Sequence, residues 1–125
     1  MRAVKVVGLD HVVLNSADIE RSLAWYADVL GLEPMNVDAW RRGDMFFPSV
    51  RLNATTIIDI FPAERTGENV NHVCLVVEDA NIDALAEQFP EGHRVDRNFG
   101  AQGYGASLYV HDPDGNTVEL KTYPS

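Results

Sequence analysis

The sequence is poor in cysteine, in long apolar runs and in basic residues, and each shortage excludes a class of protein. Its single cysteine, Cys74, rules out a disulfide within the chain and fits a reducing compartment, so we expect a cytoplasmic protein. No apolar run approaches the ~20 residues that a membrane-spanning helix needs, and residues 1–10 do not resemble a secretory signal peptide. Only 10 Lys and Arg face 19 Asp and Glu, and the net charge of -9 argues against nucleic acid and anionic membranes as partners.

What remains is the composition of an ordinary soluble domain. The 125 residues are enough for one hydrophobic core, and 46% of them are hydrophobic while 23% are charged. The Tyr and Trp residues are not interleaved with a basic stripe, which again argues against nucleic-acid binding. We therefore expect the partner to be a small molecule that is neutral, cationic or bound to a metal.

The first half of the chain combines one helical pattern with several strand patterns. Apolar residues recur at helical spacing in the segment 16–32, where Ser16 or Asp18 can cap the start of a helix and Gly31 its end. Runs of β-type residues predict one strand before this helix and three after it, over residues 4–15, 33–41, 44–53 and 55–61.

The second half repeats this order of patterns. A strand is predicted over residues 71–79, a helix over 81–92, and three more strands up to Tyr123. Each half therefore runs strand, helix, three strands, which makes an internal duplication the main finding of the sequence.

The alignment of the two halves gives the module boundaries. Residues 10–14 match 71–75 at an offset of 61, and 57–60 match 117–120 at an offset of 60. The polar, turn-rich stretch between the halves is the only plausible linker. We predict an α+β domain of two βαβββ modules, with module one at 1–62, the linker at 63–69 and module two at 70–125.

Each module carries a histidine on its first strand and a carboxylate on its last. These residues are His11 and Asp59 in module one, and His72 and Glu119 in module two, with nearly equal spacings of 48 and 47 residues. Taken singly, a histidine on a strand is usually a hydrogen-bonded structural residue. Glu119 shares its strand face with Thr117 and Lys121, which is typical of the wet side of an edge strand.

Asp59 is the carboxylate that is hardest to dismiss. It lies between Ile58 and Ile60, and a carboxylate within an apolar run costs several kcal/mol unless it is paired or binds a metal. Two imidazoles and one or two carboxylates form a mixed nitrogen and oxygen site for one divalent ion, such as Fe, Mn, Ni, Co or Zn. Because no thiolate belongs to the set, a closed structural zinc site is not expected.

The turn before the last strand adds a tyrosine to this set. Asp112-Pro113-Asp114-Gly115 is a strong turn signal, and a three-residue hairpin loop there places Tyr109 opposite Glu119 on one face. A phenol beside a metal-bound substrate can orient it or pass a proton. Tyr109 can equally be an ordinary strand aromatic. Cys74 is interpreted as a buried thiol rather than a nucleophile.

The chain resembles the vicinal oxygen chelate superfamily, which includes glyoxalase I, extradiol dioxygenases and bleomycin-sequestering proteins. The resemblance covers nearly the whole chain and rests on the repeat, on the helical segment 17–32 and above all on the ending SLYVHDPDGNTVEL, residues 107–120. It implies two βαβββ modules that form an incomplete eight-stranded barrel around a metal site, commonly in a homodimer. It also implies metal ligands at His11, His72 and Glu119.

The resemblance leaves the reaction open. The fourth ligand position, a glutamate in glyoxalase I, holds Asp59 here, and the dioxygenases have no protein ligand at this place. A ligating Asp59, which could also act as a base, favours lyase or isomerase chemistry, and a non-ligating one favours dioxygenase chemistry. Tyr109 matches a tyrosine that contacts substrate. The alternative is a non-catalytic binder of a small molecule or antibiotic. Each site can also be built within one chain or across a swapped dimer.

Overall fold

The computed structural model describes residues 5, 7–78 and 80–124, and the chain divides into two compact units between Thr66 and Gly67. This division falls within the segment 63–69 that the sequence suggests as a linker. In the part of the chain that is described, no helix is long and apolar enough to cross a membrane.

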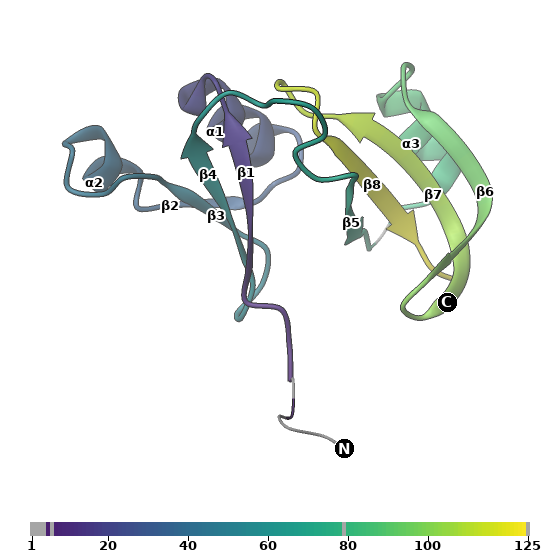
Figure 1. Ribbon diagram of the computed structural model, residues 1–125. Helices are drawn as coiled ribbons and strands as arrows, with labels where there is room; N and C mark the ends of the chain where they lie inside the picture. Colours follow the sequence, from purple (N-terminus) through teal and green to yellow (C-terminus); the bar gives the residue numbers. More distant parts are fainter. Residues whose placement is uncertain (1–4, 6, 79, 125) are drawn as a thin grey trace. The chain divides into compact units, whose positions relative to one another are not determined.

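Each unit contains one four-stranded mixed sheet, and the strand order is the same in both. In the first unit, β1 (His11–Ser16) pairs in parallel with β4 (Ile57–Pro62), which is followed by β3 (Ser49–Arg51) and β2 (Glu33–Met35) in antiparallel order. In the second unit, β5 (Val73–Val76) pairs in parallel with β8 (Thr117–Thr122), followed by β7 (Gly103–His111) and β6 (His93–Gly100) (Figure 1). The predicted α+β class and the four strands per module are confirmed.

Helix α1 (Ile19–Asp28) covers one face of the first sheet. Of the two residues predicted to cap it, Asp18 accepts a hydrogen bond from the Arg21 N–H at 3.1 Å. Gly31 beyond its end has a φ of 72°, the left-handed conformation that glycine adopts without strain. The helix packs against β4 and buries an apolar stripe, so the core of this unit consists of Leu14, Ile19, Leu23, Tyr26, Val50, Ile58 and Ile60.

Helix α3 (Ile82–Gln88) has the same role in the second unit. The Asn81 side chain caps it by accepting from the Ala84 N–H at 2.9 Å, and the helix lies against β7 and β6. The core of this unit consists of Leu75, Leu85, Leu108, Val110, Val118 and Leu120. In both units the sheet face opposite this core carries the predicted ligands.

The strand predicted over residues 33–41 is wrong in its second half. Strand β2 ends at Met35, Asn36 takes a left-handed φ of 61°, and the next residues form the short helix α2 (Val37–Arg41). The left-handed residue stops the strand, and the Arg41 guanidinium then binds Glu20 of α1 at 2.8 Å. Tertiary contact thus overrides a weak local β pattern.

Other predicted strands are shorter than their sequence patterns. The first begins only at His11, since residues 7–10 are irregular, and positions 4 and 6 lie outside the described residues. Within 44–53 only Ser49–Arg51 pairs with neighbours, and within 71–79 only Val73–Val76 does, with Asp79 also outside the described residues.

Candidate metal centre

Parallel strand pairing brings one histidine and one carboxylate together in each unit. Val13 lies opposite Asp59 in the first sheet, and Cys74 lies opposite Glu119 in the second. The histidine precedes the paired residue by two positions in both cases. Its ring therefore lies on the same sheet face as the carboxylate, one step along the neighbouring strand.

The two pairs differ mainly in the distance between their donor atoms. His72 Nε2 lies 3.2 Å from Glu119 Oε1, and His11 Nε2 lies 3.8 Å from Asp59 Oδ2. Both carboxylates are buried, with exposed fractions of 5% for Asp59 and 4% for Glu119. The longer distance in the first unit follows from chemistry, because aspartate is one methylene shorter than glutamate.

The residue before each histidine fixes the orientation of its ring. His11 Nδ1 lies 2.7 Å from Asp10 Oδ2, and His72 Nδ1 lies 2.7 Å from Asn71 Oδ1. The Asn71 amide nitrogen is used elsewhere, since it donates to Glu68. Because an oxygen acceptor faces each Nδ1, the proton of a neutral ring belongs on Nδ1 and the Nε2 lone pair points at the carboxylate. This is the second-shell arrangement of metal-bound histidines.

A serine hydroxyl occupies the other oxygen of each carboxylate. Ser49 Oγ donates to Asp59 Oδ1 at 2.7 Å, and Ser107 Oγ donates to Glu119 Oε2 at 2.6 Å. One oxygen is thus held by a serine while the other faces a histidine. Each carboxylate is prepared to offer a single oxygen to a cation.

Each pair combines an imidazole and a carboxylate, which divalent ions accept, but only one pair has the spacing for a shared ion. Two ligands at about 2.1 Å from one ion lie about 3.0 to 3.4 Å apart at octahedral or tetrahedral angles. The His72–Glu119 separation of 3.2 Å falls in this interval, and the His11–Asp59 separation of 3.8 Å exceeds it. Among the described residues no three His, Cys, Asp or Glu side chains gather in a group that could hold a metal. The predicted ligands come together in pairs, one pair in each unit.

A buried polar network surrounds Glu119. Asn98 Nδ2 donates to Glu119 Oε2 at 3.2 Å, and Lys121 Nζ lies 3.8 Å from the same oxygen while donating to the Asn98 carbonyl at 2.7 Å. Burial alone would raise the pKa of Glu119, but hydrogen bonds from Ser107 and Tyr109 and the charge of Lys121 lower it below its usual value. The carboxylate is therefore ionised and ready to bind a cation at neutral pH.

The position of β8 corrects one sequence interpretation. We took Thr117 and Lys121 to mark the wet side of an edge strand, but β8 lies between β5 and β7, and Lys121 is only 1% exposed. Sequence reasoning also missed Ser49, Ser107 and Asn98. The hairpin register places Ser107 opposite Lys121, so that serine could have been found, whereas no local signal marks Ser49.

Tyr109 has the predicted place in the hairpin. It lies directly opposite Glu119 in the β7–β8 register, so the prediction that both side chains share one face is confirmed. Asn98 Nδ2 donates to the Tyr109 hydroxyl at 2.8 Å, and the Tyr109 ring lies 5.6 Å from the His72 ring. Burial and the negative charge of Glu119 raise the pKa of Tyr109, which keeps the phenol protonated at neutral pH.

Cys74 differs from its sequence interpretation. The residue is exposed rather than buried. Its thiol nevertheless lies beside Glu119, and partial desolvation and that negative charge raise its pKa to about 11. A thiol with this pKa is almost wholly protonated at neutral pH, which agrees with the expectation that Cys74 is not a nucleophile.

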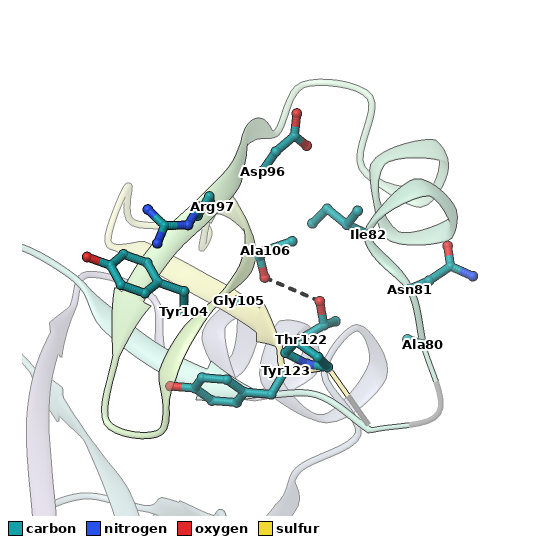
Figure 2. A pocket seen from close by; sticks show the side chains of 11 residues that line it. Ala80, Asn81, Ile82, Asp96, Arg97, Tyr104, Gly105, Ala106, Thr122 and Tyr123 are labelled. Carbon is teal, nitrogen blue, oxygen red and sulfur yellow. Dashed lines mark hydrogen bonds between the residues drawn. The ribbon is translucent and has the colours of Figure 1, made fainter.

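A separate pocket lies in the second unit, on the sheet face opposite Glu119. Figure 2 shows it between β6, β7, the end of β8 and the start of α3. Arg97 lies over the Tyr104 ring at 3.6 Å, and Thr122 Oγ1 donates to the Ala106 carbonyl at 3.3 Å. Along their strands, Ala106 and Thr122 are out of phase with the residues beside Glu119, so their side chains point to the opposite face of the sheet. The pocket is therefore separate from the His72–Glu119 pair.

Comparison with known proteins agrees with this arrangement. The sequence profile of the Glyoxalase/Bleomycin resistance protein/Dioxygenase superfamily matches residues 8–120. The chain belongs to this superfamily. The match spans both His–carboxylate pairs, so the paired residues are parts of the superfamily domain itself.

Three similar proteins illustrate the range of the superfamily. The Virulence protein STM3117 of Salmonella typhimurium is 28% identical over 122 residues, which cover 92% of this chain and 83% of that protein. A Probable lactoylglutathione lyase of Synechocystis is 25% identical over 122 residues, covering 88% and 91%. The solved structure of an integron cassette protein, VCH_CASS1, from the mobile metagenome of V. cholerae has a TM-score of 0.73 and 26% identity, covering 98% and 100%.

Proposed function

We propose that this protein is a metal-dependent enzyme of the glyoxalase/extradiol-dioxygenase type, which chelates a small oxygen-bearing substrate on a divalent ion. The observation that supports this proposal is the duplicated pair in which a histidine Nε2 faces a buried carboxylate oxygen, at 3.8 Å for His11–Asp59 and 3.2 Å for His72–Glu119. A neutral imidazole and a carboxylate both direct lone pairs at the space between them. A cation in that space is favourable, and it can be a proton shared by the pair or a metal ion that replaces it.

The proposed ligands are His11, His72, Glu119 and Asp59, holding one ion of Fe, Mn, Ni, Co or Zn. When bound, such an ion supplies Lewis-acid stabilisation of negative charge on the substrate oxygens. The hydroxyls of Ser49 and Ser107 hold the carboxylates, and the side chains of Asp10 and Asn71 hold the imidazoles. Together they fix the two donors of each pair.

Tyr109 is the proposed proton donor beside the site. Its hydroxyl accepts a hydrogen bond from Asn98 and donates its own proton to Glu119, so a substrate oxygen would compete with that carboxylate for the proton. The raised pKa keeps that proton in place at neutral pH. Tyr109 would thus orient the substrate or protonate an oxygen on which negative charge develops.

Asp59 decides between the two reaction types. As a weak or substrate-displaced ligand it would accept a proton from a carbon next to the chelated oxygens, which is the chemistry of a lyase or isomerase. The similarity to a Probable lactoylglutathione lyase supports this branch. Dioxygenase chemistry becomes the better proposal if Asp59 makes no contribution to metal affinity.

The first test is metal uptake by the wild type and by His72→Ala. We expect one divalent ion per site in the wild type by elemental analysis, and at least about tenfold weaker affinity in the variant. His93→Ala is the matched control, because His93 is also an exposed histidine and its ring lies 6.3 Å from that of Tyr109, but it belongs to neither His–carboxylate pair. Absence of stoichiometric metal under every loading condition would refute the enzyme proposal and favour a non-catalytic, bleomycin-resistance-like binder.

The second test separates the branches. A hemithioacetal isomerase assay with Ni(II) or Zn(II) reports lyase or isomerase chemistry. Oxygen consumption with Fe(II) and catechols reports the dioxygenase branch. In whichever of the two assays detects activity, we expect Tyr109→Phe to lower kcat while metal affinity stays unchanged.

A further inference from the structure

We propose that the substrate carries an aryl group next to its chelating oxygens, and that Phe46, Phe47 and Phe61 bind this group. The proposal rests on the proposed function, because it places these rings beside the ligand Asp59. It concerns the first unit alone.

The strand register places two of the rings on the face that carries Asp59. Phe61 follows Asp59 by two residues in β4, so both side chains point to the same side. Ser49 pairs with Asp59, and the next step of that pairing is the hydrogen bond from the Ile60 N–H to the Pro48 carbonyl at 3.0 Å. Continued by one residue, this register places Phe47 opposite Phe61.

The three rings form one contiguous cluster. The Phe47 and Phe61 rings lie 4.8 Å apart at 35°, and Phe46 meets Phe61 edge to face at 5.6 Å and 86°. These are the separations at which aromatic rings attract one another. A fourth ring supplied by a ligand would find both a face and an edge to contact.

Phe46 is open to solvent and Phe47 and Phe61 are half-buried, although the unit has a well-buried core. Phe46 is 67% exposed, whereas Ile58 and Ile60 on the other face of β4 are 2% and 1% exposed. A single exposed apolar residue needs no explanation, but contiguous rings beside buried polar groups mark a binding surface.

The cluster also lies at a suitable distance from the ligands. Residues two apart on a strand are about 6.6 Å apart, so Phe61 stands one ring diameter beyond Asp59. An aryl group attached directly to a chelating oxygen pair spans a similar length. A longer or branched aliphatic group would gain less from the edge-to-face geometry of Phe46.

The fold itself does not require these rings. In the second unit the positions equivalent to Phe61 and Phe47 hold Lys121 and Ser107, which satisfy each other and Asn98 by hydrogen bonds. A module can therefore close its sheet with polar residues at this place. The aromatic cluster is a property of one half, as expected for a feature that selects a substrate.

Two hydroxamates test the proposal, because both chelate a metal through adjacent oxygens and differ only in phenyl against methyl. We expect the metal-loaded protein to bind benzohydroxamate at least about tenfold more tightly than acetohydroxamate. Phe46→Ala and Phe61→Ala should reduce this preference by about tenfold while acetohydroxamate affinity and metal content change less than about twofold. Phe99→Ala is the matched control, since Phe99 is 71% exposed and contacts Tyr104 in the other unit.

Three results would overturn the proposal. One is an equal preference in the wild type and in both variants. Another is loss of a dimer in Phe46→Ala by sedimentation, which would make the cluster a contact between copies. If the wild type takes up no metal, the proposed function fails on its own. The aryl site is then tested in the metal-free protein by adding benzyl alcohol and recording the NMR signals of the ring protons of the three phenylalanines. Shifted signals support the site, and unchanged signals overturn it.

Discussion

At the scale of single residues, each His–carboxylate pair belongs to a row of four groups: a side-chain oxygen of the preceding residue, the imidazole, the carboxylate and a serine hydroxyl. Sequence reasoning predicted the middle two, because the histidine and the carboxylate recur at equal spacing. The oxygens of Asp10 and Asn71 were visible as neighbours in the repeat, but not as partners of Nδ1. The serines depend on cross-strand register, and only the β7–β8 hairpin had a turn signal strong enough to give one.

Asp59→Glu is the sharpest test of a single ligand. The added methylene should bring the carboxylate closer to His11 Nε2 than the present 3.8 Å and raise metal affinity by about tenfold. Overpacking at this buried position should cost about 1–3 kcal/mol of stability. Asp59→Ala should weaken binding, and Glu119→Ala should weaken it more, since Glu119 has the better distance of 3.2 Å.

Calorimetric titration of the three variants with Ni(II) or Zn(II) gives the order directly. Equal affinities for Asp59→Ala, Asp59→Glu and the wild type would remove Asp59 from the ligand set. The dioxygenase branch would then be favoured over the lyase branch.

At the scale of elements, helices were predicted better than strands. The 3.6-residue periodicity marked α1 and α3, and the cap of α1 was predicted as Ser16 or Asp18, of which Asp18 accepts from a backbone N–H. The Asn81 cap of α3 was not predicted. The ends of the strands could not be predicted from the sequence, because a strand exists only where a partner strand runs beside it. Helix α2 was missed because its start depends on the left-handed Asn36, for which the sequence offers no distinct signal.

The two capping residues should each contribute measurably to stability. We expect Asp18→Ala and Asn81→Ala to lower the free energy of unfolding by about 1 kcal/mol each, since each leaves a helix N–H without its acceptor. Urea unfolding followed by circular dichroism provides the measurement. Asp18→Asn and Asn81→Asp are the controls and should stay near the wild type, and a similar loss in these variants would show that capping is not the cause.

At the scale of the whole molecule, the chain is a duplication in which fold, strand order and ligand spacing recur. This level was the most predictable from sequence, because a repeat with matching chemistry constrains the strand order of both halves together. The homodimer and the cytoplasmic location stay predictions, and sedimentation of the purified protein tests the first.

Metal binding should stabilise the whole molecule if the ligands belong to the folded state alone. At a free metal concentration of about 100 times the dissociation constant, the expected gain is about 2.7 kcal/mol. Thermal unfolding with metal and with a chelator measures it. His72→Ala should show a smaller shift, while His93→Ala should match the wild type. An identical shift in all three proteins would mean that the metal acts elsewhere.

Because the module is duplicated, its two copies can take different roles. The contrast between Phe61 and Lys121 at equivalent positions shows that the two copies differ beside their carboxylates. One copy keeps a glutamate surrounded by polar donors that leave little room for substitution. The other copy has a shorter acid and a set of rings that no internal bond constrains. Under the proposed function, substitutions among the rings of the first copy would therefore change the substrate while the His72–Glu119 pair of the second copy stays intact.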